Sequence, residues 1–158
     1  MTPAATSGEQ QASGQPGQGF PMRLEIPSDP AEALRVQGAI EQALAAIQYS
    51  EHDIFGIKLA LEEALINAIK HGNQMDRTKK VQVAYRIRAE RFDVVITDEG
   101  SGFNPADVPD PTAIENLERP CGRGLMLMRH YMTEVAFLGR GNIVQMSKLR
   151  LAESNGRP

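Results

Sequence analysis

Apolar and polar residues alternate along several short stretches of the chain, and this pattern predicts β-strands. The first stretch is "MRLEI" at 22–26, and two longer ones cover 79–88 and 91–98, separated by only two residues. A period of two places every second side chain on one face of a sheet, and the tight link indicates an antiparallel hairpin. A second hairpin is expected over 133–150, with Gly139 in its turn.

In a first helical segment, 30–48, the apolar residues recur at helical spacing. The preceding "PSDP" supplies Ser28 or Asp29 as N-cap and Pro30 for the first turn. Such a periodic stripe is typical of a helix with one buried face. Its members are Ala33, Val36, Ile40, Leu44 and Ile47.

A second helix is predicted from "SEHD" at 50–53, which has the shape of a capping box, to His71. It is expected to end there because Gly72 suits a left-handed C-terminal cap. The stripe expected to face the sheet consists of Ile57, Leu61, Ala64 and Ala68. A third helix is predicted over "GLMLMRHYM" at 124–132.

The second predicted helix also carries a polar strip. Successive residues turn by about 100° on a helix, so Glu63, Asn67 and Lys70 share one narrow face. Gly56 and Ala60 continue this strip with little bulk, which would let another group approach closely. Charged residues on a helix usually form only a solvated face, so the strip by itself does not establish a site.

The elements follow in the order strand, helix, helix, two strands, loop, helix, two strands. This order predicts an α+β fold, a two-layer α/β sandwich in which helices cover one face of a mixed, mostly antiparallel sheet. Residues 1–20 are rich in Gly, Gln, Ser, Ala and Pro, and we expect a disordered tail there. The domain is expected over 21–152, followed by a flexible C-terminus at 153–158.

The composition narrows the choice of partners and compartment. The chain has 158 residues, with 17 Lys and Arg against 20 Asp and Glu, so no strong field favours nucleic acid or an anionic membrane. No apolar run approaches the roughly 20 residues of a spanning helix, and no signal-peptide pattern is present. The single cysteine, Cys121, excludes an internal disulfide and a Cys-rich metal site. We therefore expect a cytoplasmic protein.

Two glycine motifs follow the polar strip. In "TDEGSGF" a strand ends at Asp98, whose carboxylate can accept a hydrogen bond from a ligand amine, and Gly100 and Gly102 allow close approach to the backbone. Taken alone, this motif is better explained by an ordinary Asp-Gly turn. The loop that follows, 103–121, lacks periodicity, and such a long loop is usually functional.

The second motif, "CGRGLMLM", places Gly122 and Gly124 directly before a predicted helix. In this arrangement backbone N–H groups and the helix dipole bind phosphate. A lone G-x-G is weak, since "GRG" recurs at 139–141, where a hairpin turn explains it. Three weak signals in a fixed order are together much more specific.

In that order the motifs resemble the GHKL superfamily of ATP-binding domains, which includes DNA gyrase, heat-shock protein 90 and sensor histidine kinases. "EEALINAIKHGN" resembles the asparagine box, "DEGSGF" the first glycine box and "GRGLMLMRHYMTEV" the second. Within the superfamily the chain is most similar to the anti-sigma factor serine kinases. The resemblance spans roughly 22–149 and implies the Bergerat fold, with a left-handed βαβ unit.

The resemblance also implies roles for individual residues. Asn67 would coordinate Mg²⁺, Glu63 would be the general base, and Asp98 would bind the adenine amine of ATP. Residues 103–121 would form the lid over the nucleotide. The other residues implied to contact ATP are Lys70, His71, Gly100, Gly102, Phe103, Arg119, Gly122, Arg123, Gly124 and Leu125.

Some of these assignments have alternatives. Arg119 could equally be a surface cation, and His71 is favoured as a helix-end cap over a phosphate contact. Family members often carry Thr in the last strand to support the adenine-binding Asp, whereas this chain has Asn142 and Ile143 there. Asp98 would then rely on Thr97 or water.

The leading hypothesis is an ATP-dependent serine/threonine kinase that phosphorylates a STAS-domain anti-anti-sigma protein and sequesters a sigma factor, as a homodimer. The alternative is a nucleotide-gated binding module without phosphotransfer. A sensor histidine kinase would need a phosphoacceptor helical hairpin, which the polar residues 1–20 are not expected to form.

Overall fold

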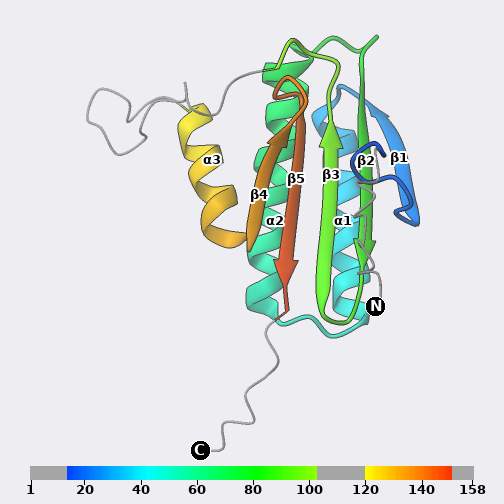
Figure 1. The fold of residues 1–158 in the computed structure, drawn as a ribbon, viewed down its shortest axis with the longest axis vertical. Helices are drawn as coiled ribbons and strands as arrows, with labels where there is room; N and C mark the ends of the chain where they lie inside the picture. Colours follow the sequence, from blue (N-terminus) through cyan, green and yellow to red (C-terminus); the bar gives the residue numbers. More distant parts are fainter. Residues whose placement is uncertain (1–13, 103–119, 151–158) are drawn as a thin grey trace, which may run out of the picture.

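Five strands form one sheet in the order β1-β2-β3-β5-β4, and all four pairings are antiparallel (Figure 1). The computed structural model describes residues 14–102 and 120–150. The strands are β1 (Met22–Pro27), β2 (Lys80–Ile87), β3 (Arg91–Thr97), β4 (Glu134–Leu138) and β5 (Ile143–Leu149). The two predicted hairpins are therefore β2–β3 and β4–β5, and within the described ranges no pairing is parallel.

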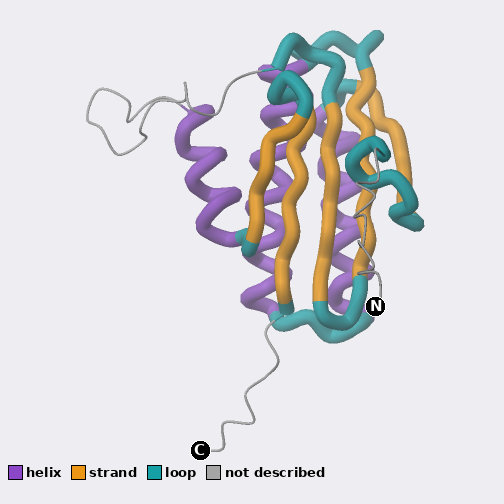
Figure 2. The backbone as a smooth tube through the Cα atoms, viewed as in Figure 1, coloured by secondary structure: helices purple, strands orange, loops and turns teal. Residues whose placement is uncertain are grey.

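The helices form a second layer on one face of the sheet, as expected (Figure 2). They are α1 (Pro30–Ala46), α2 (Glu51–Ile66), which continues as the π-helix η1 (Asn67–Gly72), and α3 (Pro120–Tyr131). The N-cap of α1 is Asp29, which accepts a hydrogen bond from the Ala31 N–H, and that of α2 is Ser50. None of the helices in the described segments is long and apolar enough to cross a membrane.

The core lies between the two layers. The α2 stripe is buried as predicted, and so is the α1 stripe except for Ile47. Ile47 is 39% exposed because α1 ends at Ala46 and the chain turns away at Gln48, which has a φ of 64°. The sheet contributes the alternate residues that the strand pattern placed inward, namely Val81, Val83, Tyr85, Phe92, Val94, Ile96, Val144 and Met146.

The end of the second helix differs from the prediction. It does not stop at His71 before a left-handed Gly72, because the backbone widens into η1 and the Asn73 N–H bonds to the Ala68 carbonyl, five residues back, at 2.8 Å. At this end of the helix the first positive φ angle occurs at Gln74, two residues beyond Gly72. Gly72 is needed for another reason: a Cβ there would lie 2.5 Å from the carboxylate oxygens of Asp98.

Helix α3 begins at Pro120, four residues before the predicted start, so Gly122 and Gly124 lie inside the helix rather than ahead of it. It packs on α2, where a Cβ at Gly56 would lie 3.0–3.4 Å from atoms of Tyr131. The close approach expected along Gly56 and Ala60 is therefore made, at Gly56, by a helix of the same chain.

Residues 14–20, which the composition assigns to the disordered tail, form a turn that crosses the open face of the sheet. We call them the N-terminal strap. Gly17, with a φ of 76°, lies against Ala84 and Val95, and its carbonyl accepts a hydrogen bond of 3.0 Å from Arg23 Nη1. The Arg86 guanidinium stacks 4.7 Å above the Phe20 ring. Residues 1–13 and 153–158 lie outside the described residues.

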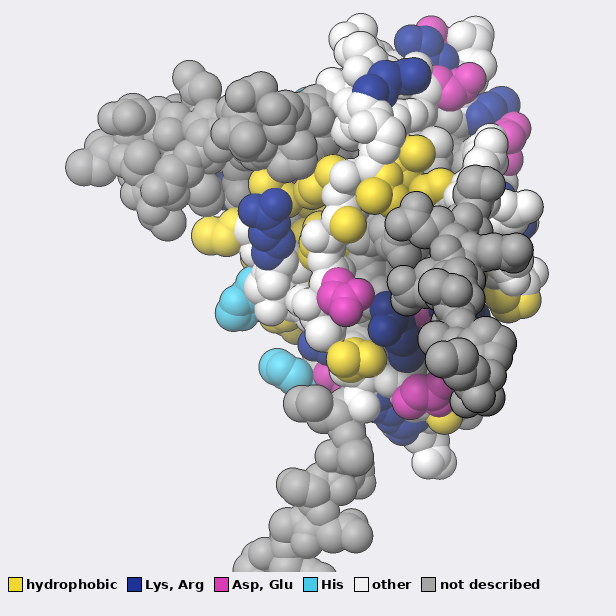
Figure 3. Space-filling model, viewed as in Figure 1, with side chains coloured by type: hydrophobic (Ala, Val, Ile, Leu, Met, Phe, Trp, Pro, Cys, Tyr) yellow, Lys and Arg dark blue, Asp and Glu magenta, His cyan; other side chains and the backbone are white. Residues whose placement is uncertain are grey.

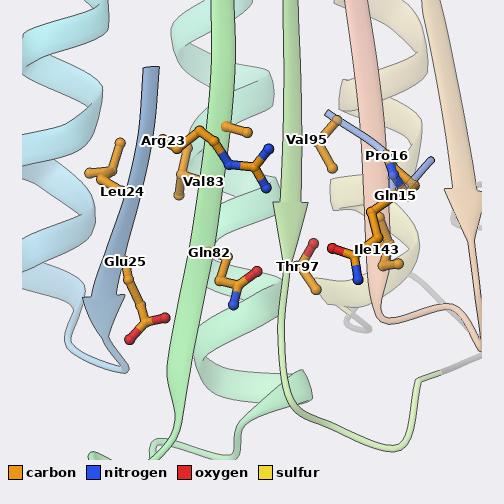
Figure 4. A pocket seen from close by; sticks show the side chains of 11 residues that line it. Gln15, Pro16, Arg23, Leu24, Glu25, Gln82, Val83, Val95, Thr97 and Ile143 are labelled. Atoms are coloured by element: carbon orange, nitrogen blue, oxygen red, sulfur yellow. The ribbon is translucent and has the colours of Figure 1, made fainter. Parts of the chain in front are cut away.

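Beside the strap, the open face of the sheet has a hollow of about 550 Å³ (Figure 4). Its lining includes Gln15 and Pro16 of the strap together with Arg23, Gln82, Thr97 and Ile143 of the sheet. Apolar side chains gather in the upper middle of this face, and charged side chains of both signs lie below them (Figure 3).

Candidate functional site

Glu63 and Asn67 of the polar strip lie together against the start of α3. A Cβ on Gly124 would be 2.6 Å from Glu63 Oε2 and 3.3 Å from Asn67 Nδ2. The asparagine box and the second glycine box are therefore in contact, although 57 residues separate Asn67 from Gly124 in the sequence. A side chain at Gly124 would displace the carboxylate of Glu63, which occupies that space.

The surroundings of Glu63 suit a proton acceptor. Partial burial raises the pKa of its carboxyl group, and the neighbouring Glu62 carboxylate raises it further. A carboxylate with a raised pKa holds a proton more readily, and a base is most effective when its pKa approaches the working pH. The strip thus presents a carboxyl group with a raised pKa and, at Asn67, an amide group one helical turn away.

Asp98 lies one residue past β3, beside the end of η1. Burial raises the pKa of its carboxyl group, whereas the hydrogen bond from the Gly100 N–H and the charges of Arg140 and Lys79 lower it; burial prevails. The Gly100 N–H donates to Oδ1 at 2.8 Å. A half-buried acceptor of this kind can bind a ligand amine, as the sequence predicts.

The first glycine box packs tightly against its own chain. A Cβ at Gly100 would overlap the carbonyl oxygen of Gly72, and a Cβ at Gly102 would overlap that of Arg140. Gly102 also has a φ of 82°, which disfavours other residues. These glycines therefore bring three backbone segments together around Asp98.

Sequence reasoning assigned no role to Asn73, the last residue of "EEALINAIKHGN", and the structure reveals one. Its side chain is fully buried and donates to Ser28 Oγ at 2.9 Å and to the Lys80 carbonyl at 3.0 Å. Its Oδ1 accepts a hydrogen bond of 2.8 Å from the Glu99 N–H. Asn73 thus fixes the loop that follows Asp98 to the end of η1. In the sequence, only its position just after a predicted helix end could have indicated this role.

The structure also shows how Asp98 is held where the family often has Thr. The Asp98 N–H donates to the Asn142 carbonyl at 2.9 Å, and Asn142 Nδ2 donates to the Asp98 carbonyl at 3.0 Å. The sequence analysis expected Thr97 or water to support the carboxylate of Asp98. Asn142 instead holds the backbone of Asp98. Asn142 is thus part of the site.

The remaining predicted residues are more dispersed. Lys70 and His71 are exposed on η1, and Arg123 is exposed on α3. The Leu125 side chain is buried in the core, so only its backbone can face a nucleotide. Gly122 lies in the first turn of α3, where N–H groups lack helical partners. Phe103 and Arg119 lie outside the described residues.

These contacts join the three sequence motifs in one region, where the asparagine box contacts both glycine boxes. The family model described as "Histidine kinase-like ATPase domain" matches residues 26–148. The chain belongs to this family. The histidine kinase-like ATPase domain accordingly covers all the described helices and nearly the whole sheet, and it confirms the resemblance seen in the sequence.

Several members of the family are similar to this chain over most of its length. The serine-protein kinase RsbW of Bacillus licheniformis is 27% identical over 136 residues, covering 80% of this chain and 84% of that protein. The anti-sigma F factor of Clostridium perfringens is 27% identical over 124 residues, covering 77% and 88%. A crystal structure of RsbU and RsbW domains from Mycobacterium tuberculosis has a TM-score of 0.55 at 17% identity, covering 82% of this chain and 32% of that one. This last likeness supports the fold alone.

Proposed function

We propose that the protein is an ATP-dependent serine/threonine kinase that acts as an anti-sigma factor in the cytoplasm, as a homodimer. It would phosphorylate a STAS-domain anti-anti-sigma protein and bind a sigma factor. The observation that carries this proposal is the contact of Glu63 and Asn67 with Gly124, which brings together the residues proposed as base, metal ligand and phosphate-binding helix start. Relatives named serine-protein kinase and anti-sigma F factor support it.

In the proposed reaction, the hydroxyl oxygen of the substrate attacks the γ-phosphorus of ATP, and ADP leaves. Glu63 accepts the hydroxyl proton, a task for which its raised pKa suits it. Phosphoryl transfer depends mainly on positioning and charge neutralisation, and the exposed cations Lys70 and Arg123 are proposed to contact the phosphates. Asp98 is proposed to accept a hydrogen bond from the adenine amine.

The residues of the strip also fit a magnesium ion. Mg²⁺ takes oxygen ligands and is usually bound by one or two protein groups together with substrate phosphates. The Asn67 amide carries one such oxygen, and its nitrogen lies near the Glu63 carboxylate at Gly124. When bound, the ion would neutralise phosphate charge, and Asn67 would hold it at the strip.

The experiment compares two substitutions on this strip. Glu63→Gln should keep ATP affinity within about twofold and reduce phosphate transfer to a STAS-domain partner at least about 100-fold, because an amide does not accept the substrate proton. Asn67→Ala should weaken Mg-ATP binding itself. Glu62→Gln, at the exposed neighbouring carboxylate, is the matched control and should preserve both properties.

Calorimetry with ATP and a phosphotransfer assay, run on all four proteins, give the answer. Equal transfer by wild type and Glu63→Gln would show that Glu63 is not the base. ATP binding without transfer to any STAS-domain partner would instead favour a nucleotide-gated binding module. No heat of binding at millimolar ATP would overturn the nucleotide site.

A further inference from the structure

We propose that Arg140 and Asn142, in the β4–β5 turn, are positioning residues that hold Asp98 against the purine ring and thereby set a preference for ATP over purine nucleotides that lack the 6-amino group. This inference rests on the proposed binding of ATP. The turn lies beside the end of β3 at the edge of the site (Figure 1), and its "GRG" sequence is otherwise explained by the hairpin alone.

Asn142 prolongs the sheet by one residue. The regular pairing of β3 with β5 ends at Thr97 and Ile143, so Asp98 lies just beyond the ladder. Asn142 then bonds both backbone groups of Asp98, accepting from its N–H at 2.9 Å and donating from Nδ2 to its carbonyl at 3.0 Å. These two bonds fix the backbone from which the carboxylate projects.

Arg140 holds the next part of the same loop. Its Nε donates to the Gly100 carbonyl at 2.8 Å, and its Cγ would lie 3.0 Å from a Cβ at Gly102. The backbone carbonyl of Arg140 also contacts Gly102 directly. The turn therefore contacts the loop at Asp98, Gly100 and Gly102, at every second residue.

The opposite side of the loop is held by one contact with backbone and one hydrogen bond to a side chain. Gly100 packs on the Gly72 carbonyl, and the Glu99 N–H bonds to Asn73. The loop is thus held between η1 and the hairpin turn. On the hairpin side, the side chains of Arg140 and Asn142 each add one hydrogen bond to the backbone contacts of the same two residues. Removing either one should loosen Asp98 without opening the core, since Arg140 is exposed and Asn142 is only half-buried.

A fixed carboxylate discriminates between ligands better than a mobile one. Oδ1 of Asp98 is already bonded to the Gly100 N–H, so the carboxylate has a defined orientation toward a ligand amine. A ligand without that amine leaves the half-buried carboxylate unpaired, and hydrogen bonds to charged groups correspond to about 10- to 100-fold in affinity. A loosened loop can turn the carboxylate to water and lose this difference.

The test measures dissociation constants for ATP and for purine riboside triphosphate, which lacks the 6-amino group, by calorimetry. Wild type should prefer ATP by about 10- to 100-fold. Arg140→Ala and Asn142→Ala should each reduce this preference at least about fivefold, with affinity for the analogue changed less than about twofold. Arg35→Ala is the matched control, because Arg35 is 76% exposed on α1 and pairs with Glu32.

A purely structural role would weaken both nucleotides alike, so an equal loss would overturn the inference, as would an unchanged preference. Arg140→Lys should recover most of the preference, because its amine can reach the Gly100 carbonyl. If Asn142→Ala does not fold, the Arg140 variants decide the outcome. If wild type binds neither nucleotide, the proposed function fails first; if it binds ATP and the variants behave as wild type, only this inference fails.

Discussion

The ionised carboxylate of Glu63 lowers the stability of the nucleotide-free protein, because it is partly buried and lies near a second carboxylate. Its pKa is raised by burial and by Glu62, so the folded state holds the proton more tightly than the unfolded state, whose ordinary value is 4.5. The stability gained from this preference is present below pH 4.5 and is lost as the pH rises through the folded pKa. At neutral pH the ionised carboxylate therefore destabilises the fold.

Glu63→Gln should accordingly raise the Tm of the nucleotide-free protein at pH 7 to 8 by on the order of a few degrees. The gain should shrink as the pH falls through and below the ordinary pKa of 4.5, because Glu63 then becomes protonated in both states. Thermal melting followed by circular dichroism over this pH range measures it. Glu62→Gln, at the exposed neighbour, should show a smaller gain; a lower Tm for Glu63→Gln at pH 7 would contradict the prediction.

Spacing predicted the residues that share one element. Glu63 and Asn67 fall on one strip because a helix has a fixed turn. The resemblance implied that Gly124 belongs to the same site, whereas its contact with Glu63 and Asn67 comes from the structure. Arg140 could not be found this way, because its partner Gly100 is 40 residues away and the link depends on how two turns meet. Backbone contacts between distant loops leave no periodic signal.

Among the elements, η1 is the one that the pattern did not predict. A π turn bonds each N–H to the carbonyl five residues back, and residue types at this position do not distinguish it from an ordinary helix end. The sequence therefore predicted that Gly72 forms a left-handed helix cap. In the structure the small size of Gly72 instead leaves room for the carboxylate of Asp98. The widened turn is followed by Asn73, whose side chain joins three other segments of the chain, at Ser28, Lys80 and Glu99.

Asn73→Ala should lower the free energy of unfolding by about 2–4 kcal/mol, because Ser28, Lys80 and Glu99 each lose a buried hydrogen bond. Urea denaturation at constant m-value measures the change. Gln82→Ala, which removes an exposed amide from β2, should stay within about 0.5 kcal/mol of wild type. A loss below about 1 kcal/mol for Asn73→Ala would mean that water replaces the amide.

At the scale of the whole molecule, alternation predicted which residues face the helices, and the pairing registers agree with it. It did not predict the N-terminal strap, because residues 14–20 contain a single large apolar side chain, Phe20, and their contacts are made by the backbone of Gly17. The strap covers Ala84 and Val95, which are 7% and 2% exposed although they face away from the helices. A composition that suggests disorder thus includes a segment with a defined place.

Deleting residues 1–20 should uncover this part of the sheet and lower stability by roughly 1–2 kcal/mol, from lost apolar burial and the lost contact of Arg86 with Phe20. Urea denaturation and binding of a hydrophobic dye measure both effects. Deleting only 1–13 keeps the strap and should leave both values as in the full chain. Identical results for the two deletions would show that the strap does not protect the sheet.

The packing of α3 on Gly56 has a spectroscopic consequence. The chain contains no tryptophan and three tyrosines, so its ultraviolet emission comes from tyrosine alone. Tyr49 and Tyr85 are buried in the core, whereas Tyr131 lies at the contact between α2 and α3, with its ring edge-on to Phe55 at 6.1 Å. Any movement of α3 away from α2 would change the surroundings of Tyr131, one of the three tyrosines. The tyrosine fluorescence of the unlabelled protein should therefore report on the position of that helix.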